Sequence, residues 1–349
     1  MTRPARLLGL ATGVPAYRLN QADVIARAER LFDRDASEIE RMMGVYDNAG
    51  IESRYSCVPL EWYERPHGWE EKNRLFLEHA VDLLEKATRE VLEQTGLEPA
   101  DIDGIVAVST TGIATPSLDA LLMERMGLRR DVWRLPVFGL GCAGGVLGLA
   151  RAAAMAVAAP KQKILYVVVE LCALTFRRSD QSKSNIIIAT ALFGDGAAAA
   201  IVGCEGEGPE IAAWGEHCWP HSLDIMGWQV TDDGLGVVFS RNIPSLVRTG
   251  LRPAAETFLR RHGWGLEDIA GFVCHPGGAK VIDALEEAFR LEPGTMADGR
   301  SVLREFGNMS AATVMFVLRR TLDAAQQSRK LLSALGPGFT AGFVVLEAA

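Results

Sequence analysis

The sequence predicts an α/β fold built from two similar halves, each a buried sheet covered by helices. Two observations lead to this prediction. Very apolar runs such as IVAV and ILYVVVEL alternate with stretches of helical period, a pattern typical of strands buried on both faces between helices. In addition, the second part of the chain repeats the order of segments found in the first. We therefore expect two copies of one plan.

The repeat is defined by pairs of matching positions separated by 166 or 167 residues. GLEPADIDGIVAV corresponds to GLEDIAGFVC, FGLGC to LREFGN, and KIL to KLL. The anchoring pairs are Ile102 with Ile269, Cys142 with Asn308, and Lys163 with Lys330. Three anchors within one residue of a single offset are hard to obtain by chance, so the pattern indicates a duplication.

The elements of each half follow in the same order. The N-terminal run LLGLATGV predicts a first buried strand rather than a signal peptide, because glycines and a proline interrupt it and polar sequence follows. Helices are expected at 75–94 and 281–291. Each half should end in a hairpin, at Gly194-Asp195-Gly196 and at Gly336-Pro337-Gly338.

The first copy carries an insert, residues 170–191, before it reaches its hairpin. Loops added to a rigid scaffold often carry function, so this insert is a candidate for substrate contact. The acidic, glycine-rich segment 203–210 is the predicted join. It divides the chain into an N-terminal half, 1–205, and a C-terminal half, 206–349.

Composition narrows the possible partners. The net charge of −8, with 36 basic and 44 acidic residues and no long basic run, argues against a nucleic-acid surface and favours a small-molecule substrate. Six cysteines without a CxxC pair or a Cys/His cluster indicate neither zinc nor disulfides, which fits a reducing cytoplasm. We expect a soluble protein without an integral membrane segment.

Cys142 is the predicted nucleophile. It follows the apolar run WRLPVFGLG and precedes an alanine-rich helical stretch, so it should lie at a strand-to-helix turn. The helix dipole and free backbone N–H groups at such a turn should lower the thiol pKa and favour the thiolate. A packed core cysteine is the structural alternative.

His275 and Asn308 are the predicted partners of Cys142. His275 stands where the buried strand GFVC ends, which is a usual place for a catalytic base. Asn308 occupies the position in the second half that Cys142 has in the first, so the two turns should meet at the centre of the molecule. Its amide could donate to a developing oxyanion or could cap the following helix.

The motifs GLGCAGG, LTFRRSD, LFGDGAAAAIVG, HPGG, GNMSAAT and LGPGF occur in one order along nearly the whole chain. Together they resemble those of the type III polyketide synthases, the chalcone-synthase-like family. The resemblance implies a thiolase-like fold with layers in the order αβαβα. It also implies a condensing acyltransferase that uses acyl-CoA and malonyl-CoA and needs no metal or redox cofactor. Cys142, His275 and Asn308 match the nucleophile, the histidine and the asparagine of that family.

The resemblance assigns further residues by position. The matches to cavity-lining or pocket-shaping positions are Cys172, Leu174, Thr175, Ser310, Gly336, Pro337 and Gly338. Arg54 matches a basic position near the CoA phosphates. Thr115, in GIATPS, matches the position at which each subunit reaches into the cavity of its partner, so a homodimer is implied.

The sequence departs from the plant pattern at the expected cavity mouth. Val237 stands where one plant gatekeeper phenylalanine would be, and the stretch 211–214, matched to the other, has no phenylalanine. The chain therefore looks most like the bacterial alkylpyrone and alkylresorcinol synthases, which are primed by fatty acyl-CoA. Pyrone and resorcinol products both fit the sequence.

Two alternatives stay open at this stage. A ketoacyl-carrier-protein synthase III-like enzyme would use the same three residues for a single condensation. A non-catalytic acyl-binding subunit would have no need for a reactive thiol.

Overall fold

A computed structural model describes residues 3–31, 44, 46, 48–178, 180, 190–322 and 329–348. Within these residues, a nine-stranded sheet runs through the molecule in the order β11-β12-β13-β8-β1-β7-β6-β4-β5. Five of the strands come from the N-terminal half and four from the C-terminal half. The predicted α/β fold is therefore confirmed.

The N-terminal half supplies one end of the sheet. Its strands are β1 (Ala5–Gly13), β4 (Gly104–Val108), β5 (Trp133–Val137), β6 (Lys163–Leu171) and β7 (Asp195–Gly203). β4 pairs in parallel with β5 and β6, whereas β7 pairs antiparallel with β6 and β1. Strands β4 and β7 are buried along their whole length, as their apolar sequences predict.

The C-terminal half supplies the other end. Its strands are β8 (Glu210–Cys218), β11 (Gly271–Cys274), β12 (Lys330–Gly336) and β13 (Thr340–Glu347). β11 and β12 are parallel, and β12 and β13 form the expected closing hairpin. β8 joins the two ends of the sheet, because Ala5 of β1 pairs with Ile211.

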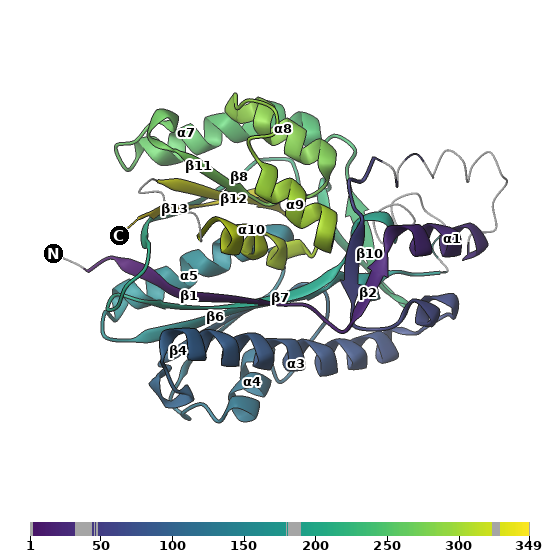
Figure 1. The fold of residues 1–349 in the computed structure, drawn as a ribbon, viewed down its shortest axis with the longest axis horizontal. Coiled ribbons are helices and arrows are strands. Elements are labelled where there is room, and N and C mark those ends of the chain that lie inside the picture. Colours follow the sequence, from purple (N-terminus) through teal and green to yellow (C-terminus); the bar gives the residue numbers. More distant parts are fainter. Residues whose placement is uncertain are drawn as a thin grey trace.

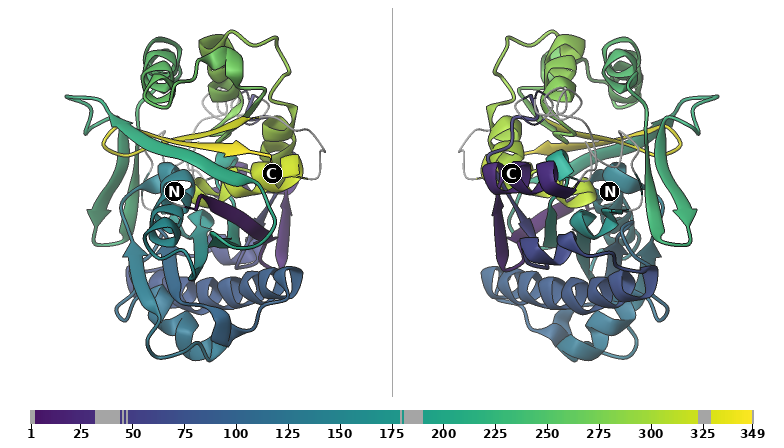
Figure 2. Two further views of the ribbon diagram at one scale, coloured as in Figure 1. Left: turned by 90° about the vertical axis from the view of Figure 1, so that its left-hand side faces the viewer. Right: turned by 90° about the vertical axis from the view of Figure 1, so that its right-hand side faces the viewer.

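Helices complete five layers, which Figure 1 shows from top to bottom. α7 (Arg252–Arg260) and α8 (Ala279–Phe289) cover the C-terminal strands, and α3 (Trp69–Thr95) and α4 (Leu118–Met126) cover the N-terminal strands. The central layer consists of α5 (Gly144–Ala158) and α10 (Thr313–Leu322). The side views in Figure 2 show the same stacking. The fold is thus the predicted αβαβα arrangement.

The central layer is packed closely because its residues are small. A Cβ on Gly145 of α5 would lie 2.2 Å from the carbonyl oxygen of Ala311, so only glycine permits this approach. The segment Gly141–Ala158 is long and apolar enough to span a membrane by composition, but 72% of it is buried in the core. Its apolar character is therefore explained by its position between the two sheet ends.

The duplication is visible in the strand starts. β4 and β11 begin at Gly104 and Gly271, and β6 and β12 begin at Lys163 and Lys330. In each half a short 3₁₀ turn precedes the central helix, at Gly141–Ala143 before α5 and at Ser310–Ala312 before α10. These two turns meet at the molecular centre.

Smaller elements lie around these layers. They are β2 (Tyr17–Asn20), α1 (Gln21–Leu31), β3 (Ser53–Ser56), β9 (Met226–Thr231), β10 (Gly234–Phe239), α6 (Ile243–Leu246) and α9 (Ala297–Phe306). β2 pairs with β3, and β9 pairs with β10. Of the predicted insert, residues 179 and 181–189 lie outside the described residues.

Candidate active site

Cys142 lies in the 3₁₀ turn directly before α5, as predicted. Gly141 has a φ of 49°, in the left-handed region that favours glycine. The predicted pocket loop, Gly336-Pro337-Gly338, packs against this turn. A Cβ on Gly336 would lie 2.3 Å from the carbonyl oxygen of Leu140. The glycines of both segments therefore permit the close contact between the loop and the turn.

The protonation state of Cys142 differs from the sequence-based prediction. The side chain is only 7% exposed. Burial raises the pKa of the Cys142 thiol to about 11, although a hydrogen bond with Ser310 lowers it and the charge of Glu170 raises it further. Desolvation of the buried sulfur therefore opposes the thiolate that the helix start was expected to favour.

His275 follows β11 and is also buried. Its backbone N–H donates to the carbonyl oxygen of Ser333, 2.8 Å away, which fixes the end of the strand. Neither imidazole nitrogen has a hydrogen-bond partner within the described part of the chain. Burial lowers the pKa of His275 to about 4, so the imidazole is neutral. One nitrogen is free to accept a proton and the other to donate one.

Asn308 is held by both halves of the molecule. Its backbone N–H donates to the carbonyl oxygen of Leu192 at 2.8 Å, and its carbonyl accepts from the N–H of Gly194 at 3.0 Å. In the side chain, Nδ2 donates to the carbonyl oxygen of Gly277 at 3.1 Å, and Oδ1 accepts from the N–H of Ser310 at 2.8 Å. The amide is thus oriented from both of its ends, and Nδ2 has a second hydrogen for a ligand.

A small cavity of about 20 Å³ is lined by Cys142 and His275, but Asn308 is not among its lining residues. Cys142, His275 and Gly277 form its polar part. The remaining wall is mainly aliphatic and aromatic, and it includes Met226, Phe239, Ile243, Val281, Leu285 and Leu335. A thiol and a neutral imidazole beside an apolar wall can bind and polarise a thioester carbonyl.

A buried carboxylate beside this site was not identified from the sequence. Glu170, on β6, is fully buried, and Oε2 accepts hydrogen bonds from the Thr110 N–H at 2.9 Å and the Thr111 hydroxyl at 2.8 Å. Oε1 has no partner among the described residues. Burial raises the pKa of Glu170 to about 7. The single acidic residue in the apolar run ILYVVVEL was the available signal.

The comparisons with known proteins identify the family of the chain. The family models for the N-terminal and C-terminal domains of chalcone and stilbene synthases match residues 2–206 and 211–349. The chain belongs to the chalcone and stilbene synthase family. It is therefore a type III polyketide synthase with a thiolase-like fold, and hence a condensing acyltransferase. This sets aside the ketoacyl-carrier-protein synthase and the non-catalytic subunit.

Named relatives cover the chain almost completely. A putative chalcone synthase of Bacillus subtilis is 38% identical, over 98% of each chain. A 1,3,6,8-tetrahydroxynaphthalene synthase of Streptomyces peucetius is 37% identical, over 99% of this chain and 93% of that protein. The crystal structure of the Streptomyces coelicolor enzyme of that name superimposes with a TM-score of 0.93 at 28% identity, over 98% of this chain and 99% of the other.

In the polyketide synthase, Cys172, Leu174 and Thr175 form a buried 3₁₀ turn after β6. The fully buried Asp195 anchors this turn by accepting the Ala173 N–H at 2.8 Å. The Thr175 hydroxyl donates to the Cys172 carbonyl at 2.6 Å. Val237, on β10, packs against the same apolar cluster as Cys172 and Leu174. The predicted cavity residues are therefore neighbours, and their contact with substrate stays a prediction.

The site has aromatic rings from other positions, although the sequence lacks phenylalanine at the two plant gatekeeper positions. Phe239, two residues after Val237, lines the cavity together with Cys142 and His275. Residues 211–214 lie in β8, in the sheet between β1 and β13, and none of them is among the residues that line this cavity. Phe193 forms a bridge with Asn308, and its ring packs edge-on against Trp228 at 6.2 Å. The synthase therefore keeps rings around its site, supplied partly by the β9-β10 hairpin.

Arg54 does not reach the surface of the polyketide synthase. It is 3% exposed, and its guanidinium donates to the carbonyl oxygen of Thr190. Burial lowers the pKa of Arg54 to about 10, and the charge of Asp195 opposes that shift. A contact with CoA phosphates would require exposure, so this position lends the predicted CoA role no support.

Proposed function

We propose that this type III polyketide synthase condenses a fatty acyl-CoA starter with malonyl-CoA by decarboxylative Claisen chemistry and cyclises the product to an alkylpyrone or alkylresorcinol. The observation that supports it best is the cavity around Cys142, His275 and Gly277, whose wall is largely aliphatic. An alkyl chain gains up to about 0.8 kcal/mol for each methylene buried against such a wall. We also propose that the enzyme is soluble and cytoplasmic and works without a cofactor.

Loading would begin with proton transfer. The neutral His275 takes the proton of Cys142 as the sulfur attacks the acyl carbonyl, and the CoA thiolate leaves with a proton returned by the imidazole. Charge then appears on both groups only during the reaction. The thiolate and imidazolium compensate each other in a buried site that disfavours either charge alone.

Extension would use the same polar groups. When malonyl-CoA loses carbon dioxide, the electron pair of the broken bond forms an enolate on the thioester oxygen. An N–H of His275 and the free N–H of Asn308 would donate to that oxygen, a contribution of about 3 kcal/mol for each donor in comparable sites. The enolate carbon then attacks the acyl group on Cys142, and the thiolate leaves as the new carbon–carbon bond forms.

We propose Arg241 and Lys280, rather than Arg54, as contacts for the CoA phosphates. Both side chains are exposed. Arg241 lies between the wall residues Phe239 and Ile243, and Lys280 directly precedes Val281, so both cations flank the cavity wall. Charge reversal of either one should raise KM for malonyl-CoA while kcat changes little, because the phosphates are remote from the reacting carbon.

We also propose a homodimer that is formed through the edge of the sheet. β5 is the last strand of the nine, and its Trp133 is 54% exposed, with Phe138 just beyond it at 59%. An unpaired edge strand with exposed rings is a liability in a monomer unless another chain covers it. The GIATPS loop contributes Ile113, which is 50% exposed. Trp133→Glu should then give a monomer in light scattering; a dimer of unchanged affinity would contradict this interface.

A second candidate product is 1,3,6,8-tetrahydroxynaphthalene, named for the Streptomyces peucetius relative. The aromatic side chains Phe193, Trp228 and Phe239 favour it, since rings can hold a planar product. Incubation with malonyl-CoA alone and with acyl-CoAs of increasing length, followed by mass spectrometry, separates the candidates. Products whose mass grows with the starter support the proposal, and one starter-independent product would overturn it.

A further inference from the structure

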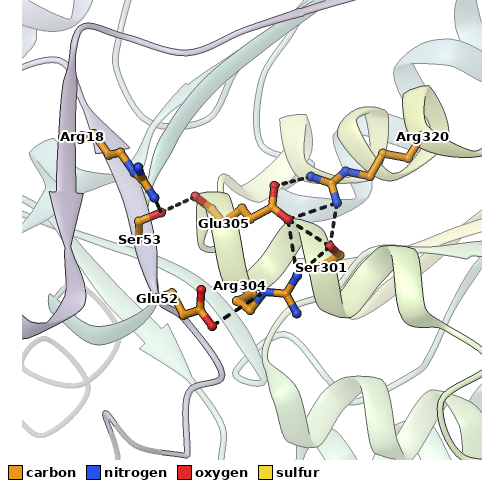
Figure 3. Close-up of polar contacts among 7 residues, drawn as sticks. All are labelled: Arg18, Glu52, Ser53, Ser301, Arg304, Glu305 and Arg320. Atoms are coloured by element: carbon orange, nitrogen blue, oxygen red, sulfur yellow. Dashed lines mark hydrogen bonds and ion pairs between the residues drawn. The ribbon is translucent and has the colours of Figure 1, made fainter.

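The strand β3 contacts the end of α9, just before Asn308, although the two segments belong to different halves. The N–H of Glu52 donates to the carbonyl oxygen of Arg304 at 2.8 Å. The hydroxyl of Ser53 donates to the carbonyl oxygen of Glu305 at 3.0 Å and accepts from Arg18 at 3.2 Å. Figure 3 shows Ser53 between Arg18 and the last turn of α9.

The side chain of Glu305 fixes the same turn from its other side. Its carboxylate accepts hydrogen bonds from Arg320 of α10 at 2.5 and 3.3 Å and from the Ser301 hydroxyl at 3.0 Å. The hydrogen bond with Arg320 lowers the pKa of Glu305, so the carboxylate is charged. Glu305 therefore joins β3 through its carbonyl and α10 through its carboxylate.

The next residue, Phe306, is held between the same elements. Its ring stacks on Tyr55 of β3 with centroids 5.8 Å apart and packs on Phe316 of α10 at 5.0 Å. Gly307 then turns the chain with a φ of 69°, and a Cβ there would lie 2.8 Å from the Leu192 carbonyl oxygen. The path from Glu305 to Asn308 thus has little freedom.

We propose that Ser53 and Glu305 are positioning residues for Asn308. Cys142 belongs to the N-terminal half and Asn308 to the C-terminal half, so their relative position depends on contacts between the halves. The Ser53–Glu305 hydrogen bond is such a contact, three residues from Asn308. A displacement of about 1 Å at a donor can cost about 100-fold in rate. The inference rests on the proposed role of Asn308 in enolate formation.

The test compares two half-reactions of the full-length enzyme. Acylation of Cys142 by an acyl-CoA, measured by intact mass, needs Cys142 and His275. Malonyl-CoA decarboxylation, measured by carbon dioxide release, instead needs the donors of His275 and Asn308. Ser53→Ala and Glu305→Ala should lower kcat for decarboxylation by about 10-fold and leave KM and the acylation rate within about 2-fold. Glu305→Gln, which keeps a hydrogen-bonding side chain, should recover part of the loss.

The controls separate positioning from general destabilisation. Glu287→Ala removes a surface ion pair with Arg248 in the same half and should change neither half-reaction. In an Asn308→Ala background, Ser53→Ala should have no further effect on decarboxylation, because the group that it positions is gone. The proposal would be overturned if Ser53→Ala lowered the decarboxylation rate further in the Asn308→Ala background. It would also be overturned if Ser53→Ala or Glu305→Ala slowed acylation and decarboxylation equally. Should Asn308→Ala itself decarboxylate like the wild type, the proposed function would fail instead. Because the side chain of Glu305 is partly exposed, Glu305→Ala should fold even if Ser53→Ala does not.

Discussion

The hydroxyl oxygen of Ser310 lies 3.5 Å from the sulfur of Cys142, and this contact joins the two turns that the duplication places at the centre of the molecule. Ser310 has a φ of 47°, which is unusual for a residue other than glycine. Its backbone N–H also donates to Oδ1 of Asn308. One residue in a strained conformation therefore contacts the nucleophile and orients the amide.

Removal of the Ser310 hydroxyl should slow reaction at the thiol. The hydrogen bond with Ser310 lowers the pKa of Cys142, so Ser310→Ala and Ser310→Gly should both raise that pKa. Alkylation of Cys142 by iodoacetamide at pH 8 should then be slower by a few-fold. The two variants should differ in stability, with glycine about 1 kcal/mol more stable because it tolerates positive φ. Equal alkylation rates in wild type and both variants would show that the contact does not affect the thiol.

Replacement of Cys142 should separate loading from decarboxylation. Cys142→Ala should abolish acyl loading and chain extension while the fold, followed by circular dichroism, is unchanged. Both Cys142→Ala and Cys142→Gln should keep some malonyl-CoA decarboxylation, because the donors of His275 and Asn308 remain. Product formation by Cys142→Ala would remove Cys142 from the mechanism. Wild-type decarboxylation by Asn308→Ala would remove the amide from it.

The fold and the contact between the two central turns could be predicted because the duplication is visible in the sequence as a repeated order of segments. Lys163 and Lys330 begin equivalent strands. Cys142 lies within the 3₁₀ turn before α5, and Asn308 lies two residues before the equivalent turn of the second half. His275 was predictable because a buried strand ends directly before it. Each of these inferences depends only on local sequence patterns and on the offset of 166 or 167 residues between matching positions.

The rest depends on contacts that no local pattern records. Phe239 enters the cavity wall because the β9-β10 hairpin packs against it, and sequence spacing does not reveal that approach. The polar sequence around Arg54 is typical of a solvated arginine. The side chain is nevertheless buried, where it donates to the carbonyl oxygen of Thr190 and interacts with the charge of Asp195, both distant in sequence. Burial likewise reverses the expected shift in the pKa of Cys142, since desolvation depends on the whole fold.

Glu170 should make stability depend on pH. Burial raises its pKa from 4.5 to about 7, so the folded state holds the proton more tightly than the unfolded state. Its contribution is complete below about pH 4.5 and is lost as the pH rises to about 7. Between pH 5 and 8, the free energy of unfolding of the wild type should fall by about 2–3 kcal/mol relative to that of Glu170→Gln, because the glutamine side chain does not titrate. Urea unfolding of both proteins measures this, and parallel pH profiles would contradict it.

Starter choice is expected to follow chain length. The aliphatic wall around Cys142 should favour medium or long fatty acyl-CoA over coumaroyl-CoA, because each further methylene that is buried adds up to about 0.8 kcal/mol. Val237 and Cys172 belong to one packed cluster beside the site. Phenylalanine at either position should narrow the space for the chain, since a close-packed interior does not absorb the added volume.

The measurement is the ratio of kcat/KM across acyl-CoAs of increasing length, which reports differences in transition-state binding. Val237→Phe and Cys172→Phe should each shift the optimum toward shorter starters by several carbons. Val238→Phe is the matched control, because neighbouring side chains of a strand point to opposite faces and this ring should leave the profile as in wild type. If the wild type gains nothing with chain length, or if all three variants share its profile, the aliphatic starter is wrong and only the condensing chemistry of the family stands.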